Sequence, residues 1–309
     1  MDFRQLQYLT TVAKYRNVTK AADALYISQS ALSHYIKNIE DELGVLIFDR
    51  STTPISLTEA GRCYMESAQR ILSENERLMK ELRDITNHMS GVLHIGTSND
   101  RCAYMIPKLL PAFYEKYPNI RIDVVSEKGQ VLESMLKSGE LDLVLLPSLD
   151  KEDESIFVYE KMYEEELLLV TKKGIIAKED RIDGKHIVHP KLINKLPFFL
   201  QEQGHVHRNY CDAFFRANKV RPEIKQVFRS NISCFRMAAT GEGVTIVPFM
   251  TTQLAYPGEE VELFSIGNPP KTWNVYMIYR KEYYLGKPEK ELIALAKEIF
   301  SKERRSPLR

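Results

Sequence analysis

Apolar and polar positions alternate in three different ways along the chain. Residues 1 to about 57 carry short helical patterns interrupted by polar turns, and residues 58 to about 89 carry one uninterrupted helical pattern. From Gly91 onward, short apolar strands alternate with amphipathic helices. Because this alternation is typical of α/β domains, the pattern predicts a helical N-terminal region, one long helix and an α/β domain with mostly parallel strands.

The elements expected in the α/β zone are short. Strands are predicted at Val92–Ile95, Ile120–Val125, Leu141–Leu146, Leu167–Val170, Val244–Val247 and Val275–Ile278. Helices are predicted at Met105–Tyr117, Gln130–Ser138, Val206–Asn218, Ile232–Thr240 and Pro288–Phe300. Pro288 suits the first turn of the last helix, where its missing N–H costs nothing.

Two short helices are predicted within the N-terminal zone. Thr19 is the expected N-cap of the first, Lys20–Leu25, and Ser28 is the expected N-cap of the second, Gln29–Leu43. Only three or four residues separate them, which is typical of a helix-turn-helix.

The second helix of this pair has an apolar face and a polar face. The apolar face is formed by residues at helical spacing, namely Leu32, Ile36, Ile39 and Leu43. The other side carries hydrogen-bonding residues, with Gln29 on the flank: Ser30, Ser33, His34 and Lys37. Such a face suits a recognition helix in the major groove, and an ordinary solvated face is the alternative.

The long helical pattern carries a heptad seam. Thr58 is its expected N-cap, with Glu59 in the first turn. Spacings of four and three alternate along the seam residues Tyr64, Ala68, Ile71, Asn75, Leu78, Leu82, Ile85 and Met89. A single helix of about 45 Å cannot bury this stripe by itself. We therefore expect a coiled coil with a second copy, with Asn75 helping to set its register, in preference to packing against the same chain.

Composition excludes several classes of protein. With 309 residues, 44% apolar and 28% charged, the chain can bury the cores of two or three globular domains. Its net charge is only +1, so attraction to nucleic acid or membranes must be local. The four cysteines form no CxxC pair, which fits a reducing cytoplasm. No signal peptide and no run of about 20 apolar residues is present, so a membrane span is not expected.

Residues 17–50, which read NVTKAADALYISQSALSHYIKNIEDELGVLIFDR, resemble the LysR-type transcriptional regulators. Residues 57–61 (LTEAG) resemble the segment that opens the linker helix of that family after its wing. The resemblance continues at residues 91–96 (GVLHIG), 107–118, 138–142 (SGELD) and 239–248.

The resemblance implies an α/β protein with an N-terminal all-α winged helix-turn-helix at 1–57, a dimerising linker helix at 58–90 and a two-lobed effector domain at 91–309. That domain would resemble periplasmic binding proteins, with lobe I at about 91–161 and 266–300 and lobe II at about 162–265. Crossover strands near Tyr159–Met162 and Glu262–Ile266 would form the hinge. The implied partners are double-stranded promoter DNA, a small-molecule effector and further copies of the chain in a dimer or tetramer, in the cytoplasm and without a cofactor.

The resemblance also assigns DNA-contacting residues. On the recognition helix, Gln29, Ser30, Ser33, His34 and Lys37 would face bases or phosphates. The wing would be formed by Arg50 with Ser51, Thr52 and Thr53. Many members of the family have Arg where this chain has His34, so the operator sequence stays open. Residues 1–70 carry eight basic and eight acidic side chains, and a dimer reading two half-sites would compensate for this neutrality.

In two-lobed domains of this kind, the ligand lies between the lobes at the carboxyl ends of strands. The residues expected at these places are Ser98, Asn99, Lys128, Gly129, Gln130, Pro147, Ser148, Gln201, Gln203, Ser230 and Asn231. Because Lys128 and at least two helix N-termini belong to this group, a small anion is favoured over a neutral or aromatic ligand. Plain helix capping is the alternative for each residue.

Several other functions were weighed. Residues 204–208 (GHVHR) resemble the peroxide-sensing segment of some LysR-type regulators, but Val206 and Phe215 stand where the two reactive cysteines would be. A metal site is disfavoured because His186, His189, His205 and His207 lack completing ligands. No P-loop, GxSxG or HExxH motif supports an enzyme, and the helix-turn-helix opposes a transport protein. A regulator that responds to a metal, to redox state or to no ligand is the remaining alternative.

Overall fold

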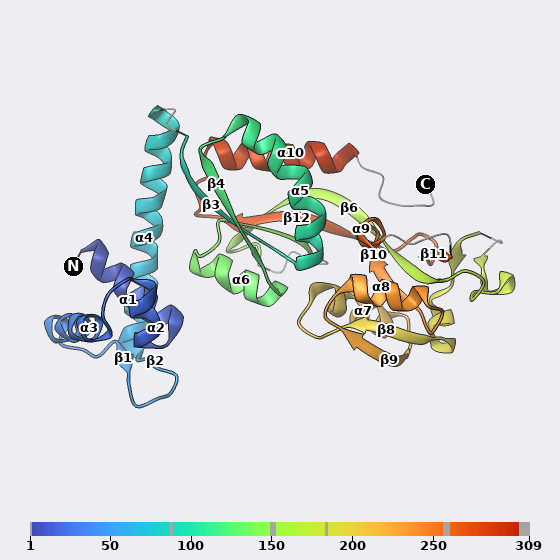
Figure 1. Ribbon diagram of the computed structural model, residues 1–309, viewed down its shortest axis with the longest axis horizontal. Coiled ribbons are helices and arrows are strands. Elements are labelled where there is room, and N and C mark those ends of the chain that lie inside the picture. Colours follow the sequence, from blue (N-terminus) through green and yellow to red (C-terminus); the bar gives the residue numbers. More distant parts are fainter. Residues whose placement is uncertain (1, 87–88, 149–152, 183–184, 256–259, 303–309) are drawn as a thin grey trace. The chain divides into compact units, whose positions relative to one another are not determined.

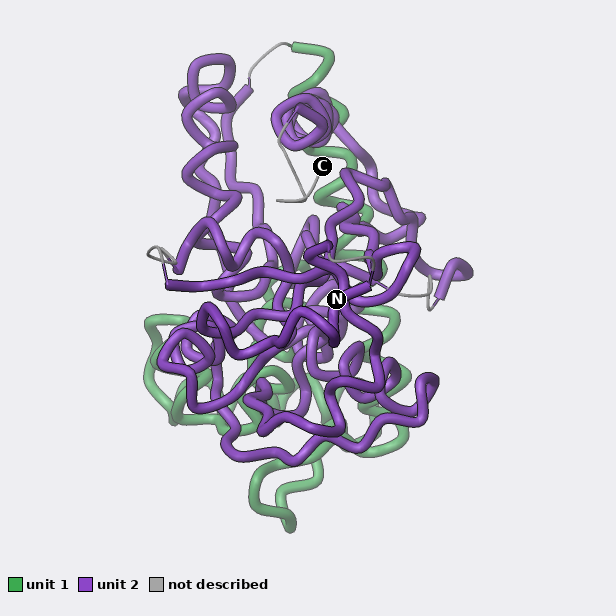
Figure 2. Tube along the Cα trace, turned by 90° about the vertical axis from the view of Figure 1, so that its right-hand side faces the viewer, with its two compact units in different colours: residues 1–86 green, residues 87–309 purple. Residues whose placement is uncertain are grey.

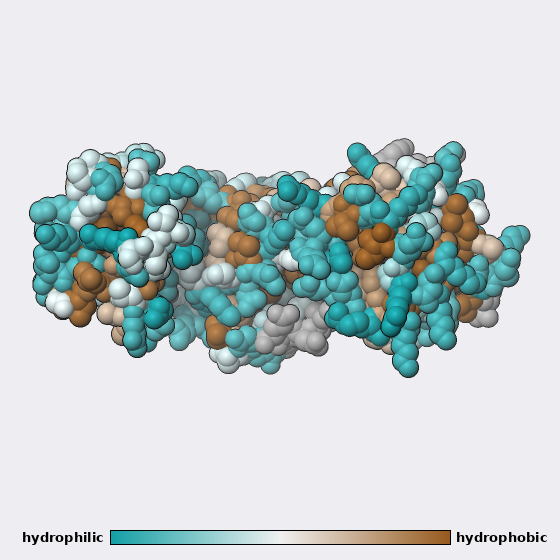
Figure 3. All heavy atoms as spheres, turned by 90° about the horizontal axis from the view of Figure 1, so that it is seen from below, coloured by the Kyte–Doolittle hydropathy of each residue, from teal (hydrophilic) through white to brown (hydrophobic). Residues whose placement is uncertain are grey.

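The structure is a computed structural model that describes residues 2–86, 89–148, 153–182, 185–255 and 260–302. The chain divides into two compact units, Met1–Thr86 and Asn87–Arg309 (Figure 2). The expected domain boundaries at 57/58 and 90/91 remain predictions. On the face drawn in Figure 3, hydrophobic side chains form small groups among hydrophilic ones.

The first unit contains four helices and a small hairpin. The helices are α1 (Phe3–Tyr15), α2 (Val18–Ala24), α3 (Gln29–Leu43) and α4 (Glu59–Thr86). Between α3 and α4, β1 (Phe48–Asp49) pairs antiparallel with β2 (Ser56–Leu57). The core is formed by apolar residues of α1, α2, α3, β1 and α4, and includes Leu9, Leu32, Ile36 and Phe48.

Capping groups explain where α2 and α3 begin. The Ser28 side chain accepts a hydrogen bond from Ala31 N, so α3 starts where the sequence predicts. The prediction for α2 is wrong, because Asn17 is its N-cap and accepts from Lys20 N, which places Thr19 inside the helix. Leu43 is 44% exposed, so it does not extend the buried face of α3 as expected.

The second unit is built on an eight-stranded sheet in the order β4-β3-β5-β12-β6-β11-β7, with β10 also paired to β6 (Figure 1). The strands are β3 (Gly91–Thr97), β4 (Ile120–Ser126), β5 (Leu143–Ser148), β6 (Phe157–Lys172), β7 (Ile187–Val188), β10 (Thr245–Pro248), β11 (Val261–Ile266) and β12 (Thr272–Arg280). A separate parallel pair is formed by β8 (Pro197–Gln201) and β9 (Glu223–Phe228).

The helices of this unit connect the strands. They are α5 (Asn99–Lys116), α6 (Gly129–Ser138), α7 (Val206–Ala217), α8 (Asn231–Ala239), α9 (Phe249–Leu254) and α10 (Lys287–Lys302), with short 3-10 turns at Lys178–Asp180 and Pro190–Lys195. Helix α5 begins six residues earlier than predicted. Its first turns carry Asp100 and Arg101, which are charged yet buried by partners elsewhere in the fold.

The expectation of mostly parallel strands is wrong at the centre of the sheet. β12 runs antiparallel to both β5 and β6, and β10 and β11 run antiparallel to β6. Among the strands in the described ranges, parallel pairing joins β3 to β4 and β5, β7 to β11, and β8 to β9, and a single parallel bridge joins Phe198 to Val244. Along the chain β11 and β12 follow one another without a helix between them, and both pair antiparallel with β6.

Strand β6 belongs to both lobes. Its residues up to Glu166 pair with β12, and its residues from Leu167 onward pair with β10 and β11. The lobes therefore meet near Glu166–Leu168, opposite residues 267–271. The hinge expected at Tyr159–Met162 and Glu262–Ile266 is misplaced, because the first segment lies within lobe I and the second within lobe II.

Candidate nucleic-acid interface and ligand cleft

The polar face of α3 lies on the surface of the first unit. Gln29, Ser30, His34 and Lys37 are exposed and Ser33 is half-buried. The opposite face, with Leu32 and Ile36, is packed in the core. Gln29 Nε2 donates a hydrogen bond to Ser33 Oγ at 2.9 Å, which orders the donors and acceptors at the amino end of the helix. All five predicted residues are therefore on one accessible surface.

The wing residues occupy the loop between β1 and β2. Ser51, Thr52 and Thr53 are exposed. Arg50 Nη2 lies 2.8 Å from Glu40 Oε2, so its guanidinium is tied to the carboxyl half of α3. The Asp49 carboxylate accepts hydrogen bonds from the hydroxyl and amide of Ser51, which lower the pKa of Asp49. The loop is thus anchored at its base and presents hydroxyl groups at its tip.

Glu40 is the buried carboxylate that connects α3 to the wing. One of its oxygens accepts from the backbone N–H groups of Ile47 and Phe48, at 2.9 and 3.1 Å, and the other accepts from Arg50. Its side chain is 3% exposed. Glu40 could not be found from the sequence, since an exposed acid and a buried acid on a helix look alike there.

The seam of α4 is covered at one end only. Ala68 is buried and Tyr64 packs against the core of the first unit, while Ile71 and Asn75 are half-buried. Further along, Leu78, Leu82 and Ile85 are 52%, 45% and 76% exposed. Met89 is wrong as a seam residue, because α4 ends at Thr86 and Met89 packs against the core of the second unit.

The expected ligand residues lie where strands end and helices begin. Ser98 caps α5 and is half-buried, with Asn99 exposed beside it. Lys128 is the N-cap of α6, which opens at Gly129 and the exposed Gln130. Pro147 and Ser148 were expected to follow a strand, which is wrong, because β5 includes both.

The remaining ligand residues come from lobe II. Gln201 ends β8, is buried, and donates to the carbonyl of Arg229 at 3.0 Å. Gln203 is exposed. Ser230 caps α8 through Ile232 N, and Asn231 is the buried first residue of that helix. The residues expected to bind the ligand thus come from the starts of α5 and α6 and from β8 and the start of α8.

The two lobes contact each other near these residues. Lys128 Nζ of lobe I lies 2.9 Å from Glu202 Oε1 of lobe II. Gly129 fits closely against lobe II, since a Cβ atom there would lie 2.6 Å from Val206 Cγ2. The anion expectation rested on Lys128 as a receiving cation, and in the structure this amine is already paired with a carboxylate.

A second contact between the lobes is made by Asp100, which the sequence analysis did not identify. Asp100 Oδ1 accepts from Ser230 Oγ at 3.1 Å, and Oδ2 accepts from Asn231 N at 3.0 Å. Burial raises the pKa of Asp100, and the two hydrogen bonds oppose that rise. An acid in the first turn of α5 was the available signal, but the predicted helix began too late to include it.

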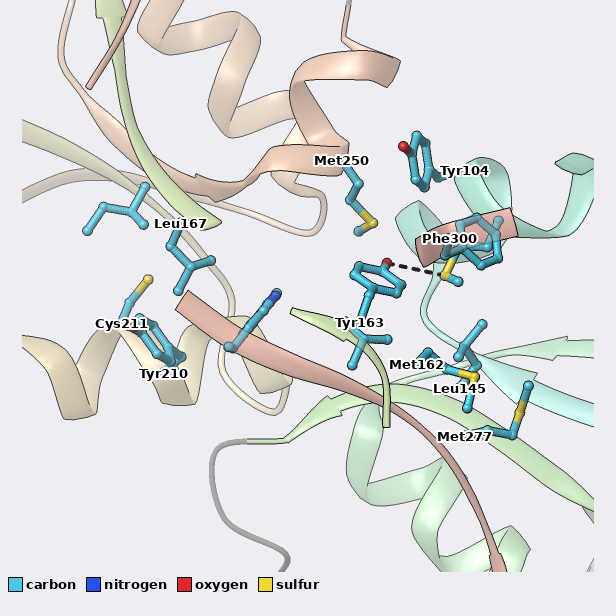
Figure 4. Close-up of a cluster of buried hydrophobic side chains, with 14 of the residues drawn as sticks. Tyr104, Leu145, Met162, Tyr163, Leu167, Tyr210, Cys211, Met250, Met277 and Phe300 are labelled. Atoms are coloured by element: carbon cyan, nitrogen blue, oxygen red, sulfur yellow. Dashed lines mark hydrogen bonds between the residues drawn. The ribbon is translucent and has the colours of Figure 1, made fainter. Parts of the chain in front are cut away.

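Glu165 joins four elements where the lobes meet. This buried carboxylate accepts from Arg101 Nη2 at 3.1 Å, from Trp273 Nε1 at 2.9 Å and from Met250 N at 2.7 Å. Burial alone would lower the pKa of Arg101, but Tyr163 and Glu165 raise it above its usual value. Figure 4 shows the apolar side chains packed here, with Tyr210 and Cys211 of α7 on one side and Tyr163 and Phe300 on the other.

The four histidines have different neighbours, and His205 Nε2 lies 3.5 Å from Glu202 Oε1. His186 stacks on Phe264, His189 accepts from Lys191 N, and His207 packs edge-on against Trp273. Among the residues that the structure describes, no group of three or more His, Cys, Asp or Glu is placed to hold a metal ion.

The thiol nearest to the peroxide-sensor segment is Cys211. It is buried, with Sγ 3.6 Å from His207 Nε2. Burial raises the pKa of the Cys211 thiol and lowers the pKa of His207 from 6.5 to about 3. Both groups are neutral at pH 7, so the environment disfavours the thiolate that a peroxide-reactive cysteine needs.

Two family models match the chain. The model of the bacterial regulatory helix-turn-helix protein, lysR family, matches residues 3–62, and the model of the LysR substrate binding domain matches residues 86–301. No helix in the described ranges is long and apolar enough to cross a bilayer.

Known proteins match over most of their length. An uncharacterized HTH-type transcriptional regulator of Bacillus subtilis, YybE, is 30% identical over 80% of this chain and 82% of its own. The DNA-binding transcriptional dual regulator OxyR of Escherichia coli is 28% identical over 91% of this chain and 90% of its own. A solved structure of a full-length OxyR variant from Pseudomonas aeruginosa matches with a TM-score of 0.73 at 22% identity, covering 100% of this chain and 97% of the other.

Proposed function

The chain belongs to the LysR family of bacterial helix-turn-helix transcriptional regulators. On that premise we propose which residues bind DNA, which pair two copies of the chain and which bind the effector. As a member it is a DNA-binding regulator with an effector-binding domain, not an enzyme. We place its action in the cytoplasm, where promoter DNA is found. The finer assignments below concern the operator, the assembly and the effector site.

Operator recognition is assigned to the amino half of α3. Gln29, Ser30, Ser33, His34 and Lys37 lie on one accessible face, and their side chains offer donors and acceptors of the kind that read base edges. The single observation that carries this assignment is the exposure of this face opposite the buried Leu32–Ile36 face. Ser51, Thr52 and Thr53 reach the DNA backbone beside it, and Arg50 holds the wing in place through Glu40.

Pairing of two copies is assigned to the second half of the α4 seam. Leu78, Leu82 and Ile85 keep about half or more of their surface exposed, and the heptad spacing matches a coiled coil. Two paired first units present two copies of α3, which adds affinity that a neutral domain lacks by itself.

The effector site is assigned to the cleft between the lobes. Its lining residues come from strand ends and helix starts of both lobes, so a bound molecule contacts both at once. A molecule that binds the closed cleft more tightly than the open one shifts the lobes toward closure. Closure then changes how paired copies hold the DNA. A peroxide response is not carried over from the relatives, because Val206 stands at the position of the reactive cysteine.

The test uses alanine variants of α3 in the full chain. Ser33→Ala and Lys37→Ala should each weaken binding to a selected operator duplex by about tenfold, as expected for the loss of one base or phosphate contact worth about 1–2 kcal/mol. Both should keep the melting temperature, since neither side chain is in the core. Lys173→Ala, which removes an exposed charge from the second unit, serves as the control and should bind normally. Unchanged binding in both α3 variants would refute the assignment.

A further inference from the structure

Arg16 stands where α1 ends and the helix-turn-helix begins. It is the C-cap of α1, and the next residue, Asn17, is the N-cap of α2. In a helix-turn-helix the first helix crosses the DNA backbone while the second lies in the major groove. Since α2 is the first helix and α3 the second, a cation at the start of α2 lies near phosphates when α3 occupies the groove.

The same residue is attached to the wing. Arg16 Nε donates a hydrogen bond to the Ile55 carbonyl at 3.4 Å, and Ile55 N donates to the Arg16 carbonyl at 3.2 Å. Ile55 follows the wing residues Ser51, Thr52 and Thr53 and leads directly into β2. The Arg16 side chain is thus held at the base of the wing, beside the start of α2.

The charge of Arg16 is available to an anion outside the protein. Its side chain is exposed, and no carboxylate in the described ranges lies at ion-pair distance from it. The acid of the wing, Asp49, is bound instead to Ser51. Arg16 therefore differs from Arg50, whose guanidinium is paired with Glu40. Only Nε of Arg16 is used within the unit, so its terminal N–H groups can bind phosphate oxygens.

The backbone of Arg16 is in an unusual conformation for a long side chain. Its φ is +48° and its ψ +28°, in the left-handed region. Glycine and asparagine adopt this region at lower cost than arginine does. An arginine in this conformation, with no counter-charge in its own unit, points to a role outside the unit.

We propose that Arg16 is a DNA-backbone contact whose guanidinium binds a phosphate of the duplex at the base of the wing. The proposal rests on the DNA-binding role proposed for the first unit. A phosphate contact carries no sequence information, so Arg16 adds affinity equally for the operator and for any other duplex. It supplies local positive charge to a unit whose basic and acidic residues are balanced.

The experiment measures the dissociation constants of the full chain for a selected operator and for a scrambled duplex at several salt concentrations. Arg16→Gly removes the guanidinium and suits the positive φ, so the melting temperature, followed by circular dichroism, should stay the same or rise. At about 0.1 M salt, binding to both duplexes should weaken by roughly tenfold for each subunit bound. The slope of log affinity against log salt should become shallower by about 0.9 for each subunit.

Two further variants separate the charge of Arg16 from its hydrogen bond to the wing. Arg16→Gln keeps a donor for the Ile55 carbonyl without the charge, and it should bind as weakly as Arg16→Gly. Arg16→Lys keeps the charge and should keep the salt slope of the wild type. If Arg16→Gln binds like the wild type, or if Arg16→Lys has the shallow slope of Arg16→Gly, the residue acts by bracing the wing and the proposal is overturned.

The control is Arg4→Ala, which removes an exposed positive charge near the other end of α1. It should bind both duplexes like the wild type. An equal loss in Arg4→Ala and Arg16→Gly would show that only the net charge of the unit matters, which contradicts a phosphate contact at Arg16.

The outcomes distinguish this proposal from the assignment of α3. If Ser33→Ala and Lys37→Ala bind normally while Arg16→Gly weakens both duplexes, the α3 assignment fails and the Arg16 contact stands. If the wild type prefers the operator and Arg16→Gly binds both duplexes as the wild type does, only the role of Arg16 is refuted. Weakening of the operator alone would make Arg16 a reader of bases and also overturn the proposal. A wild type that binds neither duplex overturns both assignments.

Discussion

Glu40 is the residue that holds the wing against α3, because its two oxygens bind two backbone N–H groups and Arg50. Glu40→Ala leaves both buried N–H groups without an acceptor, so we expect a loss of about 2–4 kcal/mol of the unfolding free energy of the first unit. The ion pair with Arg50, whose side chain is half-exposed, contributes the smaller part of this loss. Urea unfolding followed by circular dichroism measures the change. Glu42→Ala, an exposed acid on the same helix, should stay within about 0.5 kcal/mol; equal losses would contradict this role.

His207 gives the second unit a defined pH dependence. Burial lowers its pKa from 6.5 to about 3, so the folded protein binds this proton more weakly than the unfolded chain. The contribution of neutral His207 to the free energy of unfolding is therefore complete above pH 6.5. It is lost as the pH falls from 6.5 toward 3, by up to about 1.4 kcal/mol per pH unit. Urea unfolding followed by Trp273 fluorescence at pH 7.5, 6.5 and 5.5 tests this.

The comparison that isolates His207 is the variant His207→Gln. It should be less stable at every pH, because a packed ring is lost, but its stability should fall less steeply between pH 6.5 and 5.5 than that of the wild type. If the free energies of unfolding of the two proteins fall equally with pH, a group other than His207 causes the pH dependence.

At the scale of residues, the sequence revealed the exposed polar groups better than the buried ones. The α3 face was predicted from spacing alone, since exposure on an amphipathic helix follows from its periodicity. Glu40, Asp100 and Glu165 were missed, because each is an acid whose burial depends on donors 7 to 131 positions away. Partners so distant leave no local pattern.

At the scale of elements, several helices were predicted to within one residue at each end. Helix α3 has the bounds expected from Ser28, and α6, α7 and α8 differ from expectation by only a residue at an end. Strands were harder to predict from the sequence than helices. The apolar pattern indicated only Leu167–Val170 of β6, which is buried throughout, and the strand near Tyr159–Met162 was implied by the family resemblance alone. Charged residues among the apolar ones hide the first part of β6 from the pattern. β9 was missed because nearly all of it is exposed.

The α4 seam makes a prediction of its own. Leu78→Lys should separate paired chains, since it places a charge in the apolar stripe of the coiled coil, and sedimentation should show the smaller species at micromolar concentration. Met79→Lys is the matched control, because Met79 is equally exposed, at 50%, and lies one position off the seam. If Met79→Lys dissociates the paired chains and Leu78→Lys does not, the chains pair through a face of α4 other than the predicted seam.

At the scale of the whole effector unit, β6 and the segment between β11 and β12 connect the lobes, and the cleft contacts decide how closely the lobes meet. The two-lobed arrangement followed from the family resemblance, while the antiparallel centre of its sheet did not follow from strand–helix alternation. Alternation indicates parallel pairing only where a helix connects the neighbouring strands, and β11 and β12 follow one another without a helix between them.

Gly129 tests whether lobe contact matters. Gly129→Val places side-chain atoms where Val206 of lobe II already lies, so we expect the lobes to be held apart. Amide hydrogen exchange should become faster at residues 201–207 and 230–233 at the start of α8. Gln130→Val, at the exposed neighbouring position, should leave exchange unchanged. Unaltered exchange in Gly129→Val would show that the lobes do not depend on this contact.

The central claim is that this chain reads DNA sequence, and the most direct test is its specificity ratio. The full chain is used to select duplexes from a random pool, and its dissociation constant is then measured for the best duplex and for a scrambled one at the same salt concentration. The account predicts an operator with two half-sites, bound at least about 10³-fold more tightly than the scrambled duplex. Equal affinity for the two duplexes would contradict it.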